Sequence, residues 1–241
     1  MSNDRLGLAG NVKTVPIEIT YAPERPNLHI LAIGPTHEDL KYTGADARDF
    51  AEAFKNQENG LFNKVFIHAL SEKDNTKKDN IKKALIDLQF NYQSNTKQSI
   101  SDKDLLIVFI SSHAKQDGRN FVILPSDFEP RYESIYSLDF ERDIIQYLAN
   151  INCKKLMFLD ACNSGSAYTA VSGMKSTDKG LAEAINKINS TLPGMSTITS
   201  CQKQEKSYED KAWENGAFTE SILEAFSNKP FADKNLSLIH I

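Results

Sequence analysis

The sequence contains little of what marks a secreted, membrane-spanning or nucleic-acid-binding protein. Its 241 residues include only three cysteines, widely spaced, which fit neither a disulfide framework nor a CxxC metal site. Nowhere do ~18 or more apolar residues follow one another, and the N-terminus leads into no apolar signal segment. The formal net charge of −4 argues against nucleic acid or an anionic membrane as the main partner. These absences favour a cytoplasmic protein.

Phosphate-binding glycine loops and metal-ligand clusters are also missing. Neither GxGxxG nor GxxxxGK followed by Ser or Thr occurs after any apolar run, which disfavours a nucleotide- or cofactor-binding α/β module. That module stays an alternative, and a thermal-shift experiment with nucleotides would test it. The histidines His29, His37, His68 and His240 share no ligand spacing with a Cys or a carboxylate, so we interpret them as structural or surface residues. We therefore predict no cofactor and no metal.

Short apolar runs alternate with amphipathic stretches along most of the chain. Apolar residues make up 40% of the sequence and charged residues 25%, and the length suits one substantial domain. The runs that predict strands are 28–34, 64–70, 104–112, 155–161 and 196–201, with a short β piece at 121–125; helical spacing appears at 46–56, 76–90, 140–148 and 215–227. We predict an α/β three-layer sandwich, with a mostly parallel sheet of about six strands and helices on both faces.

The chain divides into a short N-terminal segment and one main domain. Residues 1–27 hold three of the eight prolines and predict an extended strap or edge strand. Residues 28–241 form the predicted domain. Within it, 163–195 is a long polar segment with a helical stretch near its end. The apolar run 235–241 ends abruptly, which suggests that the chain is truncated and lacks a C-terminal element.

Two of the predicted strands end on residues that can do proton or nucleophile chemistry. His113 follows the third run and Cys162 follows the fourth. Because the carboxyl ends of parallel strands meet at one edge of a sheet, an imidazole and a thiol would share that edge. An imidazole can take up the thiol proton and create a thiolate nucleophile. The alternative interpretation is a buried core thiol and a surface or capping histidine.

Two further polar residues belong to the same strand ends. Side chains alternate along a strand, so Asp160 shares a side with Cys162, and Ser111 shares a side with His113. A carboxylate that closes a buried strand is unusual without a partner. Asp160 therefore predicts a buried anion at the floor of a pocket for a Lys or Arg side chain, and Ser111 could line that pocket. A cap for nearby backbone N–H groups is the alternative interpretation of Asp160.

The pattern resembles the catalytic core of the caspase-like cysteine peptidases, which include caspases, metacaspases and their bacterial relatives. Ser-Ser-His-Ala at 111–114 and Asp-Ala-Cys-Asn-Ser-Gly at 160–165 carry the resemblance, with the spacing of roughly 50 residues between His and Cys that caspases show. The resemblance covers about 28–226, and the late segments 206–209 and 216–219 support it. It implies a caspase-like fold and a cysteine endopeptidase acting on protein or peptide substrates.

The resemblance also implies roles at the matching positions. Cys162 would attack the scissile carbonyl, His113 would act as acid and base, and the backbone N–H groups of Ala114 and Cys162 would form the oxyanion hole. Asp160 matches an acid of metacaspase-like members that cleave after Arg or Lys, and Asp46 falls where they place a second pocket acid. An N-cap of the first helix is the alternative interpretation of Asp46. Relatives often carry sensor domains or regulatory partners, and calcium activates some metacaspases.

One departure from the family pattern supports a different function. The family usually has Gly after the catalytic His, whereas this chain has Ala114, whose methyl group could crowd the oxyanion. A catalytically impaired scaffold that binds other proteins is therefore the main alternative to a His/Cys peptidase.

The long polar segment contains candidate sites of self-cleavage. Some relatives are activated by a cut between the Cys strand and the next strand. A protease with an acidic pocket could cut itself after Lys175 or Lys179, which lie among small polar residues. An ordinary solvated loop is the alternative interpretation.

Overall fold

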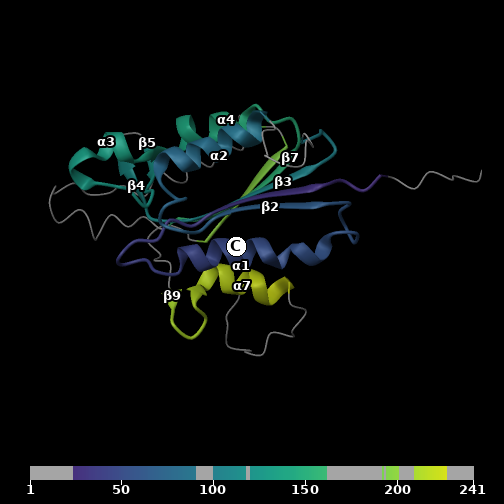
Figure 1. Cartoon of the computed structure of the whole chain (residues 1–241), viewed down its shortest axis with the longest axis horizontal. Helices are drawn as coiled ribbons and strands as arrows, with labels where there is room; N and C mark the ends of the chain where they lie inside the picture. Colours follow the sequence, from purple (N-terminus) through teal and green to yellow (C-terminus); the bar gives the residue numbers. More distant parts are fainter. Residues whose placement is uncertain are drawn as a thin grey trace, which may run out of the picture.

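A parallel sheet of five strands forms the centre of the molecule, in the order β2-β1-β3-β7-β8 (Figure 1). The computed structural model describes residues 24–90, 100–117, 120–161, 192, 194–200 and 209–226. The strands of this sheet are β1 (Leu28–Ile33), β2 (Val65–Leu70), β3 (Leu105–Ser111), β7 (Lys154–Asp160) and β8 (Met195–Thr199). All four pairings between neighbouring strands are parallel. The predicted fold class is confirmed, with five strands in the described part of the sheet where about six were expected.

Helices cover both faces of the sheet (Figure 1). One face carries α1 (Thr43–Ala53) and α7 (Ala217–Phe226), and the other carries α2 (Lys78–Phe90) and α4 (Gln146–Ala149). Parallel neighbours need a crossover segment between them, and α1 and α2 lie in the first two crossovers. The smaller elements are η1 (Lys55–Gln57), β4 (Ala114–Asp117), β5 (Asn120–Ile123), η2 (Pro130–Tyr132), α3 (Glu133–Tyr136), β6 (Leu138–Asp139), η3 (Phe140–Ile145), β9 (Glu209–Asp210) and β10 (Asn215–Gly216).

Alternate residues of each central strand pack into two separate cores. In β3, Val108 and Ile110 belong to the cluster that includes the buried face of α2, whereas Ile107 and Phe109 belong to the cluster of α1. This alternation explains why the strands appear in the sequence as continuous apolar runs, since both of their faces are buried. The same period puts the last residue of the strand, Ser111, on the α1 side.

Most of the predicted elements are confirmed, with shifted boundaries. The first helix begins at Thr43 rather than at residue 46, and the stretch predicted at 140–148 consists of a π-helix, η3, followed by α4. The predicted strap falls largely outside the described residues, which begin at residue 24. The helical stretch of the polar segment and the apolar run 235–241 also lie outside them.

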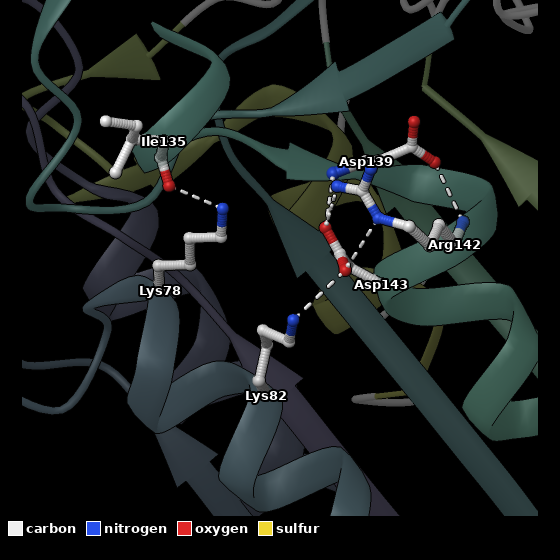
Figure 2. Close-up of polar contacts among 6 residues, drawn as sticks. All are labelled: Lys78, Lys82, Ile135, Asp139, Arg142 and Asp143. Atoms are coloured by element: carbon white, nitrogen blue, oxygen red, sulfur yellow. Dashed lines mark hydrogen bonds and ion pairs between the residues drawn. The ribbon is translucent and has the colours of Figure 1, made fainter. Parts of the chain in front are cut away.

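A buried carboxylate joins α2 to η3 (Figure 2). The Asp143 side chain is 3% exposed and accepts hydrogen bonds from Lys82 Nζ at 3.2 Å and Arg142 Nη2 at 2.8 Å. The backbone N–H of Asp139 donates to it at 3.0 Å. Burial by itself raises the pKa of Asp143, but the hydrogen bonds from Arg142, the Asp139 N–H and Lys82 outweigh it and lower the pKa to about 2. The ionised carboxylate therefore holds these two helices together.

We expect Asp143→Asn to lower the free energy of unfolding by about 2 kcal/mol at neutral pH. Because the folded-state pKa lies below the ordinary value of 3.8, this stabilisation is complete above about pH 4 and is lost as the pH falls toward 2. Urea unfolding of both proteins at neutral and acidic pH measures the difference. Asp79→Asn removes an exposed carboxylate from the first turn of α2 and is the control, with an expected loss below about 1 kcal/mol. Equal losses in both variants would contradict the prediction.

Candidate active site

The strands β3 and β7 end side by side, and the candidate site lies at these ends. In their parallel register Ser111 lies opposite Asp160, and the backbone N–H of Ser112 donates to the carbonyl oxygen of Asp160 at 3.0 Å. His113 follows Ser111 by two positions in the sequence, as Cys162 follows Asp160. Cys162 is outside the described residues, so its placement against His113 stays a prediction.

Asp46 of α1 joins these strand ends from the helix that covers them. Its carboxylate accepts a hydrogen bond from Ser111 Oγ at 2.9 Å and another from the backbone N–H of Gly216 at 2.8 Å. Asp46 is 1% exposed and Asp160 is 4% exposed. We refer to Asp46, Ser111, Asp160 and Gly216 as the acidic cluster. The N-cap interpretation of Asp46 is wrong, because Tyr42 is the cap residue and the Asp46 side chain contacts β3 and β10 instead.

Gly216 leaves room for both carboxylates of the acidic cluster. A Cβ atom at this position would lie 3.2 Å from Asp46 Oδ2 and 3.3 Å from Asp160 Oδ2. Either distance is tighter than an ordinary van der Waals contact, so a methyl group here would press on both side chains. Glycine therefore lets the backbone of β10 approach the carboxylates and donate its N–H. The two acids converge on one small space beside β10.

Burial controls the charge of Asp46. Removal from water raises the pKa of its carboxyl to about 7, and the nearby charge of Asp160 acts in the same direction. The hydrogen bonds from the Gly216 N–H and the Ser111 hydroxyl act in the opposite direction. Both of these described donors are neutral. Asp46 is therefore poised between its protonated and ionised forms near neutral pH, where a cation arriving beside it would favour ionisation.

The hairpin of β9 and β10 is fastened to the start of α1 by Glu209. The backbone N–H of Tyr42 donates to Glu209 Oε1 at 2.8 Å, and that of Lys41 donates to Glu209 Oε2 at 2.9 Å. Backbone N–H groups at the start of a helix have no acceptor within the helix, so an outside carboxylate stabilises the helix there. The contact joins residues 167 positions apart, which no local sequence pattern reveals.

His113 contacts the loop that connects β1 to α1. It is 8% exposed, and its Nε2 lies 2.9 Å from Asp39 Oδ1. The ring of His37 lies against it, with centroids 5.0 Å apart and planes at 47°, and His37 Nε2 lies 3.1 Å from the carbonyl oxygen of Leu124. Burial lowers the pKa of His37, and the charge of His113 lowers it further. Sequence reasoning missed both Asp39 and the position of His37 beside His113.

Ala114 fits its position without backbone strain. It is the first residue of β4, pairs with Ile123 in antiparallel register and does not have a positive φ. The residue is buried in the same cluster as Ile110 and Phe121. Because the chain here is an extended strand, glycine is not required for its conformation. The substitution of Gly by Ala is therefore accommodated locally.

The remaining predicted site residues are not placed. Lys175 and Lys179 lie outside the described residues. In the part of the chain that the structure describes, no group of three or more potential metal-ligating side chains comes together. None of the described helices is long and apolar enough to cross a bilayer.

Comparison with known proteins agrees with the geometry of the strand ends. No curated protein matches the sequence. A family model for the caspase domain matches residues 29–240. This range includes the acidic cluster, the ends of β3 and β7, and the whole central sheet apart from Leu28, the first residue of β1. The parallel sheet with helices on both faces is the fold expected for such a match. The match therefore disfavours the alternative of an unrelated nucleotide-binding module. The chain belongs to the caspase domain family of cysteine peptidases.

Proposed function

We propose that the chain is a cysteine endopeptidase that cleaves after Arg or Lys, with Cys162 as nucleophile and His113 as acid and base. One observation supports it above the others. Asp46 and Asp160 converge at the ends of the two strands from which the chain continues to His113 and Cys162. The family provides the peptidase chemistry, and the two buried carboxylates provide a reason for a basic P1 side chain.

The proposed reaction proceeds through a thioester. His113 takes the proton of the Cys162 thiol, and the thiolate attacks the scissile carbonyl. The oxyanion of the tetrahedral intermediate is stabilised by the backbone N–H groups of Ala114 and Cys162. When the C–N bond breaks, the proton on His113 passes to the leaving amine. Water then attacks the thioester with His113 as base, releasing the carboxylic acid and restoring the thiol.

The acidic cluster supports a basic P1 residue on electrostatic grounds. Burial and the nearby charge of Asp160 both oppose ionisation of Asp46, and a guanidinium or ammonium group placed beside the two acids would favour it. Arg suits such a site because its planar fork can bind two carboxylate oxygens at once. An acidic P1 side chain would add a further negative charge to the cluster and be repelled. Ser111 would hold the Asp46 carboxylate in place through its hydroxyl.

We expect the protein to hydrolyse fluorogenic peptides that end in Arg or Lys and to leave peptides that end in Asp uncut. Cys162→Ala should abolish hydrolysis, because the thiolate that attacks the scissile carbonyl is lost. Asp160→Asn should lower kcat/KM for the Arg peptide by about 100-fold, because one partner of a buried ion pair is lost. Alkylation of Cys162 by iodoacetamide, which has no P1 side chain, is the control and should proceed equally fast in Asp160→Asn.

Two results would contradict the proposal in different ways. Equal hydrolysis of Asp and Arg peptides would exclude the acidic cluster as the P1 site while leaving a peptidase. A folded wild-type protein that cuts none of these peptides would favour the non-catalytic scaffold.

Asp46→Asn should make the protein more stable at alkaline pH. Because burial raises the folded-state pKa of Asp46 to about 7, folding is progressively weakened as the pH rises from about 4 through 7. Asparagine can replace the protonated acid, accepting from the Gly216 N–H and donating to Ser111. We expect a gain in unfolding free energy of up to about 4 kcal/mol near pH 8 and little change near pH 4.

Urea unfolding at both pH values measures this difference. Glu52→Gln, an exposed charge change on the same helix, is the matched control and should show no such pH dependence. An Asp46→Asn variant less stable than wild type at both pH values would show that the ionised carboxylate does not destabilise the folded protein.

A further inference from the structure

We infer that Asp39 is a positioning residue for His113, so that the catalytic unit comprises a cysteine, a histidine and a carboxylate rather than a His/Cys pair alone. The inference rests on the proposed peptidase function. It begins from the contact between Asp39 Oδ1 and His113 Nε2 at 2.9 Å, which is within hydrogen-bonding distance. The His113 side chain is 9% exposed and Asp39 is 47% exposed, so the carboxylate reaches the buried ring from the solvent side.

The ionisation of Asp39 decides which tautomer of His113 the contact selects. Burial of Asp39 opposes its ionisation, but the hydrogen bond from His113 and the charge of that ring outweigh it and lower the pKa of Asp39. The ionised carboxylate can only accept a hydrogen bond, so Nε2 of His113 must carry the hydrogen. A neutral imidazole protonated at Nε2 keeps its lone pair on Nδ1. In the proposed reaction Nδ1 is therefore the atom that takes the Cys162 proton.

The carboxylate also acts after the proton has moved. Once His113 holds the thiol proton it is an imidazolium, and the adjacent Asp39 charge stabilises that form. The aspartate of a serine-protease triad has the same role. In this fold the carboxylate comes from the loop between β1 and α1. His37, which also touches the ring, does not compete with this, because burial lowers its pKa and favours its neutral form.

The loop that carries Asp39 is fixed on both sides of that residue. Before it, the backbone N–H of His37 donates to the carbonyl oxygen of Leu40 at 2.9 Å, and the His37 ring bonds to Leu124. After it, Glu209 accepts the backbone N–H groups that precede α1. A loop held in this way can place a carboxylate on a ring with little loss of entropy on each turnover.

The same hairpin links the position of Asp39 to the acidic cluster. Its first residue, Glu209, holds the end of the Asp39 loop, and its last residue, Gly216, donates to Asp46. A P1 side chain that settles between Asp46 and Asp160 would thus contact the element that also fixes the Asp39 loop. The pocket and the positioning carboxylate share one support.

Kinetics of three variants test the role of Asp39. Asp39→Asn should lower kcat for the Arg peptide by about 10-fold to 100-fold with KM unchanged, because the carboxylate acts on the proton transfer and not on P1 binding. Asp39→Glu should restore part of that loss. Glu38→Gln removes the neighbouring exposed charge and should match wild type. Circular dichroism should show that all variants are folded at the assay temperature, since Asp39 is half-exposed and its contact adds little to stability. Wild-type kcat in Asp39→Asn would overturn the inference.

The tautomer of His113 gives a readout that needs no catalytic turnover. Nitrogen-15 NMR of the five imidazole side chains distinguishes a ring protonated at Nε2 from one protonated at Nδ1. Spectra taken over a pH titration should show the Nε2 form for the neutral His113 ring in wild type and Glu38→Gln, and a mixture in Asp39→Asn. If the wild type cleaves nothing, the peptidase proposal fails, and the tautomer still decides whether Asp39 fixes the ring. A neutral His113 ring protonated at Nδ1 and not at Nε2 in the wild type would refute it.

Discussion

Two carboxylates, Asp46 and Asp160, are buried beside one glycine at the ends of two parallel strands. Burial opposes the ionisation of Asp46, and the nearby charge of Asp160 opposes it further, so its pKa is raised to about 7. The Ser111 hydroxyl and the Gly216 N–H donate to the Asp46 carboxylate and hold it in place. A cation beside Asp46 would favour its ionised form, and the proposed P1 pocket rests on this property. The remaining features of the site follow from how the fold assembles this pair.

The sheet brings together residues that are far apart in the chain. Parallel pairing of β3 with β7 sets Ser111 against Asp160, and period-two alternation turns both toward the face that α1 covers. Helix α1 then supplies Asp46, and the late hairpin supplies Gly216 on one strand and Glu209 on the other. Because Glu209 also accepts the backbone N–H groups at the end of the Asp39 loop, the β9–β10 hairpin contacts both the proposed P1 pocket and the loop that carries Asp39.

The sequence alone predicted the parts of the site that depend on local pattern. Apolar runs with polar ends predicted β3 and β7, and alternation predicted that Asp160 shares a side with Cys162 and Ser111 with His113; the parallel register then sets Ser111 opposite Asp160. The assignment of Asp46 to the pocket depended on the family resemblance, since its place in a helical stretch equally suited an N-cap. Helix α1 begins at Thr43, earlier than predicted, and a distant carboxylate, Glu209, accepts the backbone N–H groups of the two residues that precede it.

Asp39, Gly216 and Glu209 could not be predicted from local pattern. Their contacts with His113, Asp46 and Tyr42 join positions 74, 170 and 167 residues apart. Contacts at such separations arise only when the whole sheet has formed, and they leave no periodicity in the sequence. The π-helical turn at 140–145 is similarly hidden, because its spacing of apolar residues is close to that of an α-helix.

The most direct test of a cation site at these two acids is the uptake or release of protons when a small cation binds. Calorimetric titration with argininamide at pH 7, in buffers of different ionisation enthalpy, counts these protons without any need for peptide cleavage. Because the pKa of Asp46 is about 7 and a cation lowers it, binding should release about half a proton, and this release should vanish in Asp46→Asn. Binding without proton release, or with the same release in that variant, would contradict the assignment of Asp46 to a cation pocket.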